Sequence, residues 1–560
     1  MGRVIGIDLG TTNSVAAFVD GGEPRIIPND RGAHLTPSVC SFCENGDILV
    51  GESARNQAIV AAERTVIHVK RRMGKTETID IGDARYSPPE IAAFILGHIK
   101  SYAEQYLGES VDGAVITVPA RFSEAARRAT RQAGERAGLS VHRILNEPTA
   151  AALAYARRDA VTRRILVYDF GGGTFDVTCL LQEGTEFTVQ STRGNEYLGG
   201  LDFDLRLERI VAKSFERDYG LSVTTDPGLL QQIRELAERA KIELSSRETA
   251  MVALPFIAGG GKPMHLRRSV TRAELNELIG EQVEQSISLT KEALTDAGFE
   301  VSTLDNLVLA GGSTRIPLVR ARLAEELGLE ATSLVNPDEI VALGAAVQAH
   351  MVETKKPVFR LTDVNSQPLG VEIDEDRYVT LLERNTRLPA EVKRVFTTVS
   401  DNQRSVEINV LQGDAERASK NRSLGKFMLS GIRTGRRGEP KIEVGFEMDA
   451  DGIVHVSARD VDTGAVQRIT VTASPGDENL DDPRLTEQRV RELTEHIAEL
   501  TGRENLYIDE EFRGEVKELL DHVRRNRNPA KLREYRVALE AVLVELGTSF
   551  EDMEVSNEGA

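Results

Sequence analysis

Hydrophobic and polar positions alternate in two different rhythms along the chain. Through residue 354, short apolar runs alternate with amphipathic stretches. The run 111–118 predicts a buried strand, and Ser123 supplies the hydroxyl that commonly caps a helix. A second helix is predicted after Asp226, with apolar residues spaced three and four apart between residues 230 and 244. Strands that alternate with helices favour an α/β architecture for this part of the chain.

A different rhythm begins after Lys355-Lys356-Pro357. From about residue 368 apolar residues recur at every second position, as at Val406, Ile408 and Val410, and turn residues separate such segments. This pattern predicts a small β-sandwich, and three later amphipathic stripes predict a short helical bundle. The predicted divisions are a first domain 1–354, a linker 355–367, a sandwich 368–474, a helical segment 475–547 and an acidic, disordered tail 548–560.

Two stretches far apart in the sequence share one layout: an apolar strand, an aspartate, a turn of small residues and a second apolar strand. They are residues 4–15, with Asp8, and 166–177, with Asp169 before three glycines; residues 307–315 form a degenerate third copy. Glycine turns let backbone N–H groups converge on phosphate, and a hydrated divalent cation would remove its repulsion from the carboxylates. We therefore predict a metal-nucleotide site between duplicated halves. For residues 166–177 alone, an ordinary tight hairpin is an equally good interpretation.

Three long motifs resemble those of the seventy-kilodalton heat-shock chaperones of the DnaK type. They are residues 6–14, 146–155 and 169–176, and the resemblance extends from residue 3 to about residue 474. It implies an actin-like, ribonuclease H-like α/β ATPase domain, a peptide-binding β-sandwich and a short α-helical lid. It also implies an ATP-dependent stress-response chaperone that binds extended hydrophobic segments of unfolded proteins. In that family ATP binding releases the peptide, and hydrolysis to ADP and phosphate captures it.

The resemblance assigns residues to a nucleotide site. Asp8, Glu147 and Asp169 would hold Mg²⁺ largely through water, and Lys70, Glu147, Asp169 and Thr174 would serve catalysis. The implied cofactors are ATP or ADP, Mg²⁺ and K⁺. The residues implied to bind the nucleotide are Gly10, Thr11, Thr12, Asn13, Gly171, Gly172, Gly173, Thr174, Glu238, Lys241, Ser245, Gly311, Gly312, Ser313, Arg315 and Asp338.

Plainer interpretations of some of these residues remain open from the sequence alone. Lys70 lies in a basic run that would ordinarily be solvated, and the helix face from Glu238 to Ser245 could be an ordinary solvated face. Cys40 and Cys43 have the spacing of a metal or redox pair. A strand is the stronger interpretation there, because the chain has only three cysteines.

The resemblance also implies residues for coupling, peptide binding and partners. Pro119 and Arg127 match positions that relay the nucleotide state, although Pro119 equally fits the end of a strand. A J-domain co-chaperone would dock at Arg143, Asn146 and Thr149, and a GrpE-type nucleotide exchange factor is implied by analogy alone. The implied peptide-binding residues are Val371, Phe396, Val406 and Ile408 in a pocket, each of which could instead be plain core, and Val399 at an arch over the peptide.

The chain departs from the family pattern at three places. Residue 121 is Arg where the family commonly has Tyr. Arg360 and Thr362 interrupt the apolar linker, so we expect less buried area there and weaker coupling between domains. Acidic residues 374–376 stand where the family has an apolar arch residue and a pair of glycines, so we expect peptides with basic flanks to bind best.

Composition and missing motifs narrow the function further. The net charge of −19 disfavours a nucleic-acid partner, and the sequence has no apolar run of about 18 residues to span a membrane. The N-terminus enters a strand without a signal segment, which predicts a cytoplasmic protein. The sequence has no G-x-x-x-x-G-K-[ST] motif, which excludes a P-loop NTPase. Two alternatives stay open: a peptide holdase with little cycling, and a sugar kinase or filament protein of the actin class.

Overall fold

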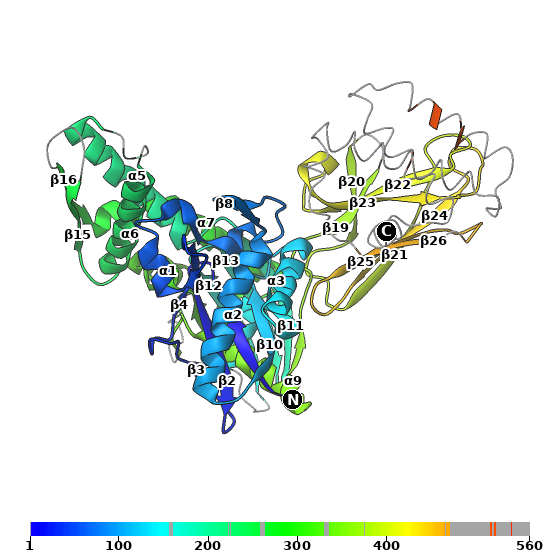
Figure 1. The fold of residues 1–560 in the computed structure, drawn as a ribbon. Coiled ribbons are helices and arrows are strands. Elements are labelled where there is room, and N and C mark those ends of the chain that lie inside the picture. The colour runs from blue at the N-terminus through cyan, green and yellow to red at the C-terminus, as the bar shows by residue number, and fades with distance from the viewer. Residues whose placement is uncertain are drawn as a thin grey trace. The chain divides into compact units, whose positions relative to one another are not determined.

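The computed structural model falls into two compact units (Figure 1). The first unit comprises Met1–Gln367, Glu383–Pro389 and Met448–Ile453, and the second comprises Pro368–Leu382, Ala390–Glu447 and the chain from Val454 onward. The structure describes residues 2–155, 161–221, 223, 226–257, 264–329, 335–373, 376–464 and 466–470, with positions 516–517, 520–521, 523 and 539. The predicted helical segment and acidic tail lie outside the described residues, apart from those last positions.

Two sheets of matching strand order form the centre of the first unit. The first sheet runs β11 (Ser140–Asn146), β10 (Val111–Val118), β1 (Arg3–Asp8), β2 (Asn13–Asp20) and β3 (Glu23–Ile27), with β4 (Thr36–Pro37) also paired to β2. The second runs β17 (Asn306–Ala310), β12 (Thr162–Phe170), β13 (Phe175–Glu183), β14 (Glu186–Asn195) and β18 (Arg360–Thr362).

The repeated feature of the two sheets is an antiparallel hairpin beside a parallel strand. In the first sheet β1 pairs antiparallel with β2 and parallel with β10; in the second β12 pairs antiparallel with β13 and parallel with β17. The mixed α/β organisation and both predicted hairpins are therefore confirmed. We call residues 3–146 the first lobe and residues 162–327 the second lobe.

Two helices join the sheets. They are α4 (Glu147–Ala154) and α9 (Ile340–Thr354), and the side chains of Val115 and Val167, one from each sheet, are buried in the same apolar cluster as α4 and α9. The helices cross closely, because a Cβ atom on Gly344 would lie 1.7 Å from the carbonyl oxygen of Ala150. Small residues at this crossing let the helices lie against each other and so fix the two hairpins relative to one another.

Amphipathic helices cover the sheets. In the first lobe, α2 (Pro88–Leu107) and α3 (Glu124–Arg136) bury residues in one apolar cluster with β1 and β10. The side chain of Ser123 accepts a hydrogen bond from the Ala126 N–H at 3.2 Å, which confirms the predicted cap. In the second lobe, α5 (Gly200–Tyr219), α7 (Arg272–Ala297) and α8 (Pro317–Leu327) do the same for β12 and β13. None of the helices described here is long and apolar enough to cross a membrane.

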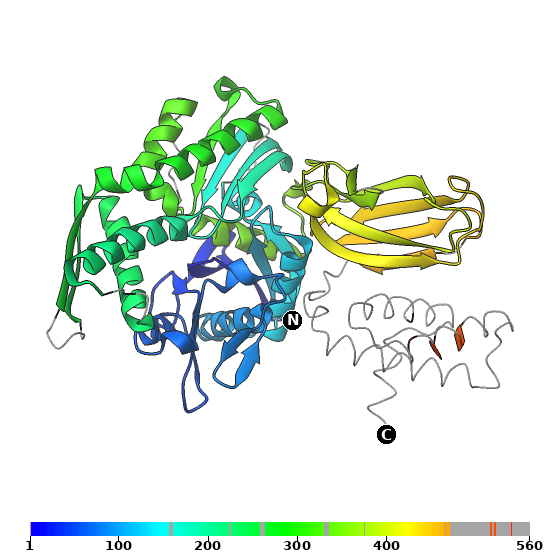
Figure 2. The same cartoon turned by 90° about the horizontal axis from the view of Figure 1, so that it is seen from above.

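Each lobe carries a smaller outer part. In Figure 2 the blue elements belong to the first lobe and the green helices to the second. The first lobe adds β5 (Val39–Phe42), β6 (Ile48–Val50), α1 (Glu52–Gln57), β7 (Thr65–Ile67), β8 (Ile79–Ile81) and β9 (Ala84–Tyr86). The second adds α6 (Pro227–Leu244), β15 (Thr249–Ile257) and β16 (Met264–Thr271). Asp226 caps α6 as predicted, and Cys40 lies buried in a strand as a free thiol.

The linker forms an edge strand of the second sheet. β18 pairs parallel with β14, and the buried ring of Phe359 packs edge-on against Phe187 with 5.7 Å between ring centroids. Arg360 is exposed and lies 3.7 Å from Glu186. The expectation that Arg360 costs buried area was therefore wrong, because the strand's alternation turns that residue to the outside. The predicted weakening of coupling stays a prediction.

The second unit contains two four-stranded sheets. One runs β20 (Arg377–Leu382), β19 (Leu369–Ile373), β22 (Ser405–Gln412) and β23 (Arg422–Ser430); the other runs β21 (Ala390–Thr397), β24 (Lys441–Met448), β25 (Val454–Asp460) and β26 (Val466–Thr470). Ile408 and Val410 are buried, Asn409 between them is partly buried, and Glu407 before them is exposed, which agrees with the period-two pattern predicted for this strand.

Candidate functional site

The turns of the two hairpins meet at a cavity of about 400 Å³ in the first unit. A Cβ atom on Gly172 would lie 2.2 Å from Thr12 Oγ1, and one on Gly173 would lie 2.2 Å from Thr11 Oγ1. At Gly172 and Gly173 the turn therefore has no room for side chains, because the hydroxyl residues of the other turn occupy that space. The plain hairpin interpretation of this stretch does not account for the contact, since the partner turn lies in the other lobe.

Three carboxylates line the cavity: Asp8 at the end of β1, Asp169 near the end of β12, and Glu147 at the start of α4. Burial, and then the charge of Glu147, raise the pKa of Asp8 to about 7. The same two causes raise the pKa of Asp169 well above its ordinary range. A hydrogen bond of 3.2 Å from Thr117 Oγ1 opposes the shift at Asp8. Because the carboxylates repel one another, a positive charge in this cavity would stabilise their ionised forms.

Lys70 supplies part of that charge. Its side chain is 5% exposed and donates a hydrogen bond to Glu147 Oε1. Burial by itself lowers the pKa of Lys70, but the nearby charges of Glu147 and Asp8 outweigh burial and raise it. The interpretation of Lys70 as part of a solvated basic run is therefore wrong, although Arg72 two residues later is exposed.

A hydrated divalent cation could neutralise the carboxylate charge that Lys70 leaves uncompensated. Within the part of the chain that is described, no three carboxylate, His or Cys groups lie close enough together to hold one metal ion directly. The repulsion between Asp8, Glu147 and Asp169 shows that the carboxylates still share one electrostatic environment. Mg²⁺ commonly keeps several of its waters, so these carboxylates are suited to hold it through water.

The other end of the cavity is lined by α6. Glu238, Lys241 and Ser245 all reach it, as their spacing on one helix face allows. Lys241 Nζ donates to Asp204 Oδ2 at 2.8 Å, and Glu238 pairs with Arg55 of the first lobe at 2.5 Å. This face is therefore not an ordinary solvated helix face. The Arg55–Glu238 pair also joins the two lobes across the cavity.

The degenerate third copy completes the lining. Gly311 has φ +78°, and a Cβ atom there would lie 2.4 Å from the carbonyl oxygen of Phe170. Ser313 Oγ donates to the carbonyl oxygen of Gly171 at 2.9 Å, which holds this turn against the second hairpin. Arg315 Nη2 lies 2.7 Å from Asp338 Oδ2 at the edge of the cavity. Gly312 lines the same edge.

Sequence reasoning missed several lining residues, most of them apolar. Ile242 is 61% exposed although it is a large apolar side chain, and it lies between Glu238 and Ser245 on the same helix face. Its spacing of four and three from those residues could have identified it. The other unpredicted lining residues are Val15, Leu35, Gly200, Ile316, Pro337 and Val341.

The predicted relay residues form a buried network with the linker. Arg127 donates to Asn146 Oδ1 at 2.7 Å, and Asn146 donates to Asp363 Oδ2 at 2.8 Å. Thr149 Oγ1 donates to the same carboxylate at 3.1 Å. Pro119 is buried where β10 ends. Two of the three residues matched to co-chaperone docking thus hold the linker in this structure; the third, Arg143, donates to Gln348 Oε1 at 3.2 Å.

The residues matched to a peptide pocket have mixed surroundings in the second unit. Val371 and Ile408 are buried, and Phe396 and Val406 are partly buried. Val399 is 47% exposed. Of the acidic arch, Asp374 and Glu375 lie outside the described residues, and Asp376 accepts a hydrogen bond of 2.6 Å from the Ser419 N–H. The peptide-binding roles stay predictions.

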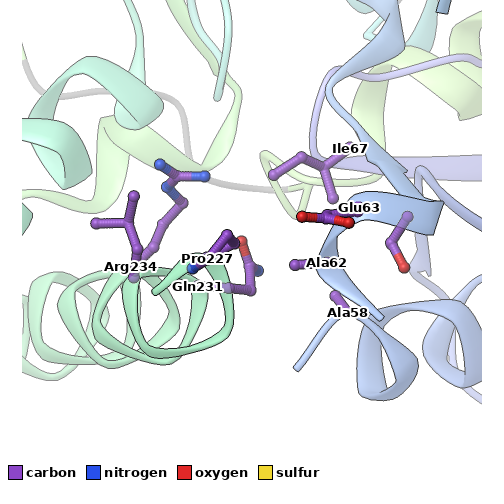
Figure 3. Close-up of a pocket in the computed structure, with 9 residues that line it drawn as sticks. Ala58, Ala62, Glu63, Ile67, Pro227, Gln231 and Arg234 are labelled. Carbon is purple, nitrogen blue, oxygen red and sulfur yellow. The ribbon is translucent and has the colours of Figure 1, made fainter. Parts of the chain in front are cut away.

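A second, smaller crevice of about 240 Å³ lies between the same two lobes. Figure 3 shows Ala62, Glu63 and Ile67 of the first lobe facing Pro227, Gln231 and Arg234 on the first turns of α6. Leu230 lines it too and is only partly buried, unlike the other apolar residues of its predicted stripe. The lobes are therefore not packed tightly against each other at this end of α6.

A comparison with family models gives a match over nearly the whole chain. The model described as Hsp70 protein matches residues 4–81 and 76–556, which together cover nearly the whole chain.

Proposed function

The chain belongs to the Hsp70 protein family, and we propose that its first unit hydrolyses ATP to control peptide binding by its second unit. Proteins of this family are ATPases that bind ATP or ADP with Mg²⁺ and act as chaperones on unfolded polypeptides together with co-chaperones. The observation that carries the proposal is the single cavity to which both hairpin turns, Lys70 and three carboxylates contribute.

Each lobe has its own part in binding the phosphates. The hydroxyls of Thr11 and Thr12 and the backbone N–H groups of residues 171–173 would bind them from opposite sides. Asp8, Glu147 and Asp169 would hold the waters of a magnesium ion, which supplies charge neutralisation at the phosphates. K⁺ is proposed as a further cation in this carboxylate-rich cavity.

Two buried groups are proposed to act on the attacking water. Lys70 carries a positive charge into the cavity, and Glu147 accepts its hydrogen bond, so the pair can orient a water toward the terminal phosphate. Asp169 would assist from the second hairpin. Thr174 lines the same cavity, and its hydroxyl would contact that phosphate.

Adenosine would occupy the other end of the cavity. Glu238, Lys241 and Ser245 on α6 offer polar groups to the ribose, and Arg315 can stack its guanidinium plane on the base. Ile242 adds an apolar surface suited to the same flat ring. The remaining residues assigned to this end, Gly311, Gly312, Ser313 and Asp338, come from the third turn and the segment before α9.

Peptide binding by the second unit follows from its strands. An extended hydrophobic segment would bind through backbone hydrogen bonds, with apolar side chains in a pocket near Val371, Phe396, Val399, Val406 and Ile408. ATP binding would favour release and hydrolysis would favour capture, because each ligand biases one conformational equilibrium. Pro119 and Arg127 would carry the nucleotide state to the linker, and the bonds to Asp363 support that route.

Partners are proposed on the same basis. A J-domain co-chaperone that docks near Arg143, Asn146 and Thr149 would act on the linker, since Asn146 and Thr149 bind Asp363. A GrpE-type exchange factor would release nucleotide by separating the lobes. We further propose that the protein works in the cytoplasm.

Single-turnover ATP hydrolysis, measured with and without an unfolded peptide, tests this function. The wild type should hydrolyse ATP faster with peptide, and Thr174→Ala should slow hydrolysis by at least about tenfold while ATP still binds. Thr295→Ala, an exposed helical threonine, serves as the matched control and should behave like wild type. Failure of the wild type to bind ATP would refute the proposal, and hydrolysis indifferent to peptide would indicate a holdase instead.

A further inference from the structure

The side chain of Arg127 donates hydrogen bonds to the backbone of the loop between β10 and α3. Arg127 Nη2 donates to the carbonyl oxygen of Ala120 at 2.9 Å, and Nε donates to that of Phe122 at 3.2 Å. The Phe122 N–H closes the turn onto the Pro119 carbonyl oxygen at 3.1 Å. Because backbone atoms on both sides of Arg121 are fixed, the position of the Arg121 side chain is set by this loop.

The end of the linker binds the same loop. Gln367 Nε2 donates to the carbonyl oxygen of Arg121 at 3.1 Å. A few residues earlier, Asp363 accepts hydrogen bonds from Asn146 and Thr149, and Asn146 is itself bound by Arg127. Linker and loop are thus joined through Gln367 directly and through Arg127 indirectly.

The Arg121 side chain points to the second hairpin. A Cβ atom on Gly194 would lie 2.8 Å from Asp176 Oδ1 and 3.1 Å from Arg121 Cδ, so these two atoms converge on one point beside β14. Asp176 is only 2% exposed, and its Oδ1 has no hydrogen-bond partner among the described residues. A buried carboxylate with an unpaired oxygen is costly unless a positive charge lies beside it.

Charge supports the same pairing. Burial and the charge of Glu147 raise the pKa of Asp176, and Arg121 is the neighbour that most opposes this shift. Asp176 is the cross-strand partner of Asp169, and it follows Thr174 by two residues. An interaction that fixes Asp176 therefore also fixes the start of β13, which directly follows Thr174.

The next residue of the loop reaches the catalytic side as well. Lys70 Nζ lies 5.9 Å from the centroid of the Phe122 ring. Two consecutive side chains, Arg121 and Phe122, thus face the second hairpin and Lys70 respectively, while the loop's backbone is bound to the linker.

We propose that Arg121 is a positioning residue that pairs with Asp176 and transmits linker docking to the hairpin carrying Asp169 and Thr174. This proposal rests on the ATPase function proposed above. It assigns a role to a position at which the chain departs from the pattern of its family. Docking of Gln367 holds the loop, the loop holds the guanidinium against Asp176, and the hairpin is held in its hydrolysis-competent position.

The test uses the full chain and separates hydrolysis from binding. Arg121→Met keeps the length of the side chain and removes the charge, so single-turnover hydrolysis should fall by about tenfold while ATP affinity changes less than about twofold. Arg121→Lys should recover at least half of the lost hydrolysis rate, compared on a logarithmic scale. Arg136→Met removes an exposed arginine that pairs with Glu90, and this matched control should leave both quantities unchanged.

A cycle of double variants identifies the route. Asp176→Asn should add little to the loss in Arg121→Met, because each change removes the same pair. Gln367→Ala should slow hydrolysis in the wild type and have no effect in Arg121→Met. Additive effects in both cycles, or hydrolysis by Arg121→Met within twofold of wild type, would overturn the proposal. Loss of hydrolysis in Thr174→Ala would be unaffected by that result, so the two proposals can fail separately.

Discussion

The two hairpins of the first unit share a design and divide its chemistry. Each has an aspartate at the end of its first strand, Asp8 or Asp169, and each turn lines the cavity. The first turn carries the hydroxyls of Thr11 and Thr12, whereas the second carries only glycines before Thr174. The side chains of one turn lie where side chains of the other would be.

Because of this difference, each hairpin depends on the other to bind a phosphate group. Had both turns kept bulky residues, the hairpins could not approach closely enough to bind one phosphate group from two sides. Had both been all glycine, the backbone N–H groups would have had no hydroxyls opposite them. The two turns are therefore complementary, and each prediction below disturbs one side of that complementarity.

The largest loss of nucleotide affinity is expected from adding a methyl group where the two turns meet. In Gly173→Ala the new methyl group would lie within 2.7 Å of three side-chain atoms of Thr11, which is itself buried. Overpacking of this kind costs about 2 kcal/mol, so nucleotide affinity should fall by about 30-fold or more. Calorimetric titration with ADP and Mg²⁺ measures this loss. Gly97→Ala, in α2 with no atom near the new methyl, should bind normally, and normal binding by Gly173→Ala would refute the contact.

Ionisation of Asp8 should make nucleotide binding depend on pH. A carboxyl whose pKa is raised by burial to about 7 holds its proton more tightly in the folded protein than in the unfolded chain. Since Mg²⁺ requires the ionised form, Mg²⁺-dependent nucleotide affinity should rise by about fivefold from pH 6 to pH 7 and by about twofold more above pH 7 before it levels off. Asp8→Asn should remove that rise. A flat profile in the wild type, with EDTA as the metal-free reference, would contradict the assignment.

Much of this cavity could be predicted because its residues lie in local patterns. Asp8 and Asp169 each end an apolar strand, and the glycines of the second turn are adjacent in sequence, so one window of about ten residues shows each element. Family resemblance then supplied Lys70 and Glu238, for which the local pattern indicated ordinary solvated surface. Burial of Lys70 depends on Glu147, 77 residues away, and no local pattern contains that information.

The residues that were missed are those whose role depends on packing. Ile242 lies off the buried stripe of its helix, on the face with Glu238 and Ser245, so periodicity places it outside the core; only the tertiary arrangement shows that this face lines a cavity. Pro337 and Val341 lie in a part of the chain with no motif. Arg121 was noted only as a departure, because its proposed partner Asp176 lies in the other lobe and no local pattern contains both residues.

A smaller effect is expected from separating the lobes at α6. Arg55 and Glu238 pair at 2.5 Å between the lobes, and both side chains are partly exposed. Removing a partly exposed pair costs about 1 kcal/mol at most, so Arg55→Ala should speed release of ADP by several-fold and leave hydrolysis of bound ATP unchanged. Stopped-flow displacement of a fluorescent nucleotide measures release. Arg247→Ala breaks a pair of the same length within one exposed helix turn, and an equal change there would show that the effect is not due to closure.

The smallest effect is expected where the two sheets differ at their edges. The second sheet gains β18 from the linker at the edge of β14, and alternation puts Phe359 against Phe187 while Arg360 faces outward. Arg360→Ala should therefore change the stimulation of hydrolysis by peptide less than about twofold, since an exposed charge 3.7 Å from Glu186 contributes little.

Phe359→Ala provides the contrast to Arg360→Ala, because the phenylalanine is 8% exposed and its loss should undock the strand. Burial of one large aromatic ring is worth about 3 kcal/mol, enough to abolish linker-dependent stimulation while basal hydrolysis persists. Single-turnover hydrolysis with and without peptide measures both variants. A large loss in Arg360→Ala with little in Phe359→Ala would restore the sequence-based expectation that the polar residues set the strength of coupling, and it would show that the linker docks by its other face.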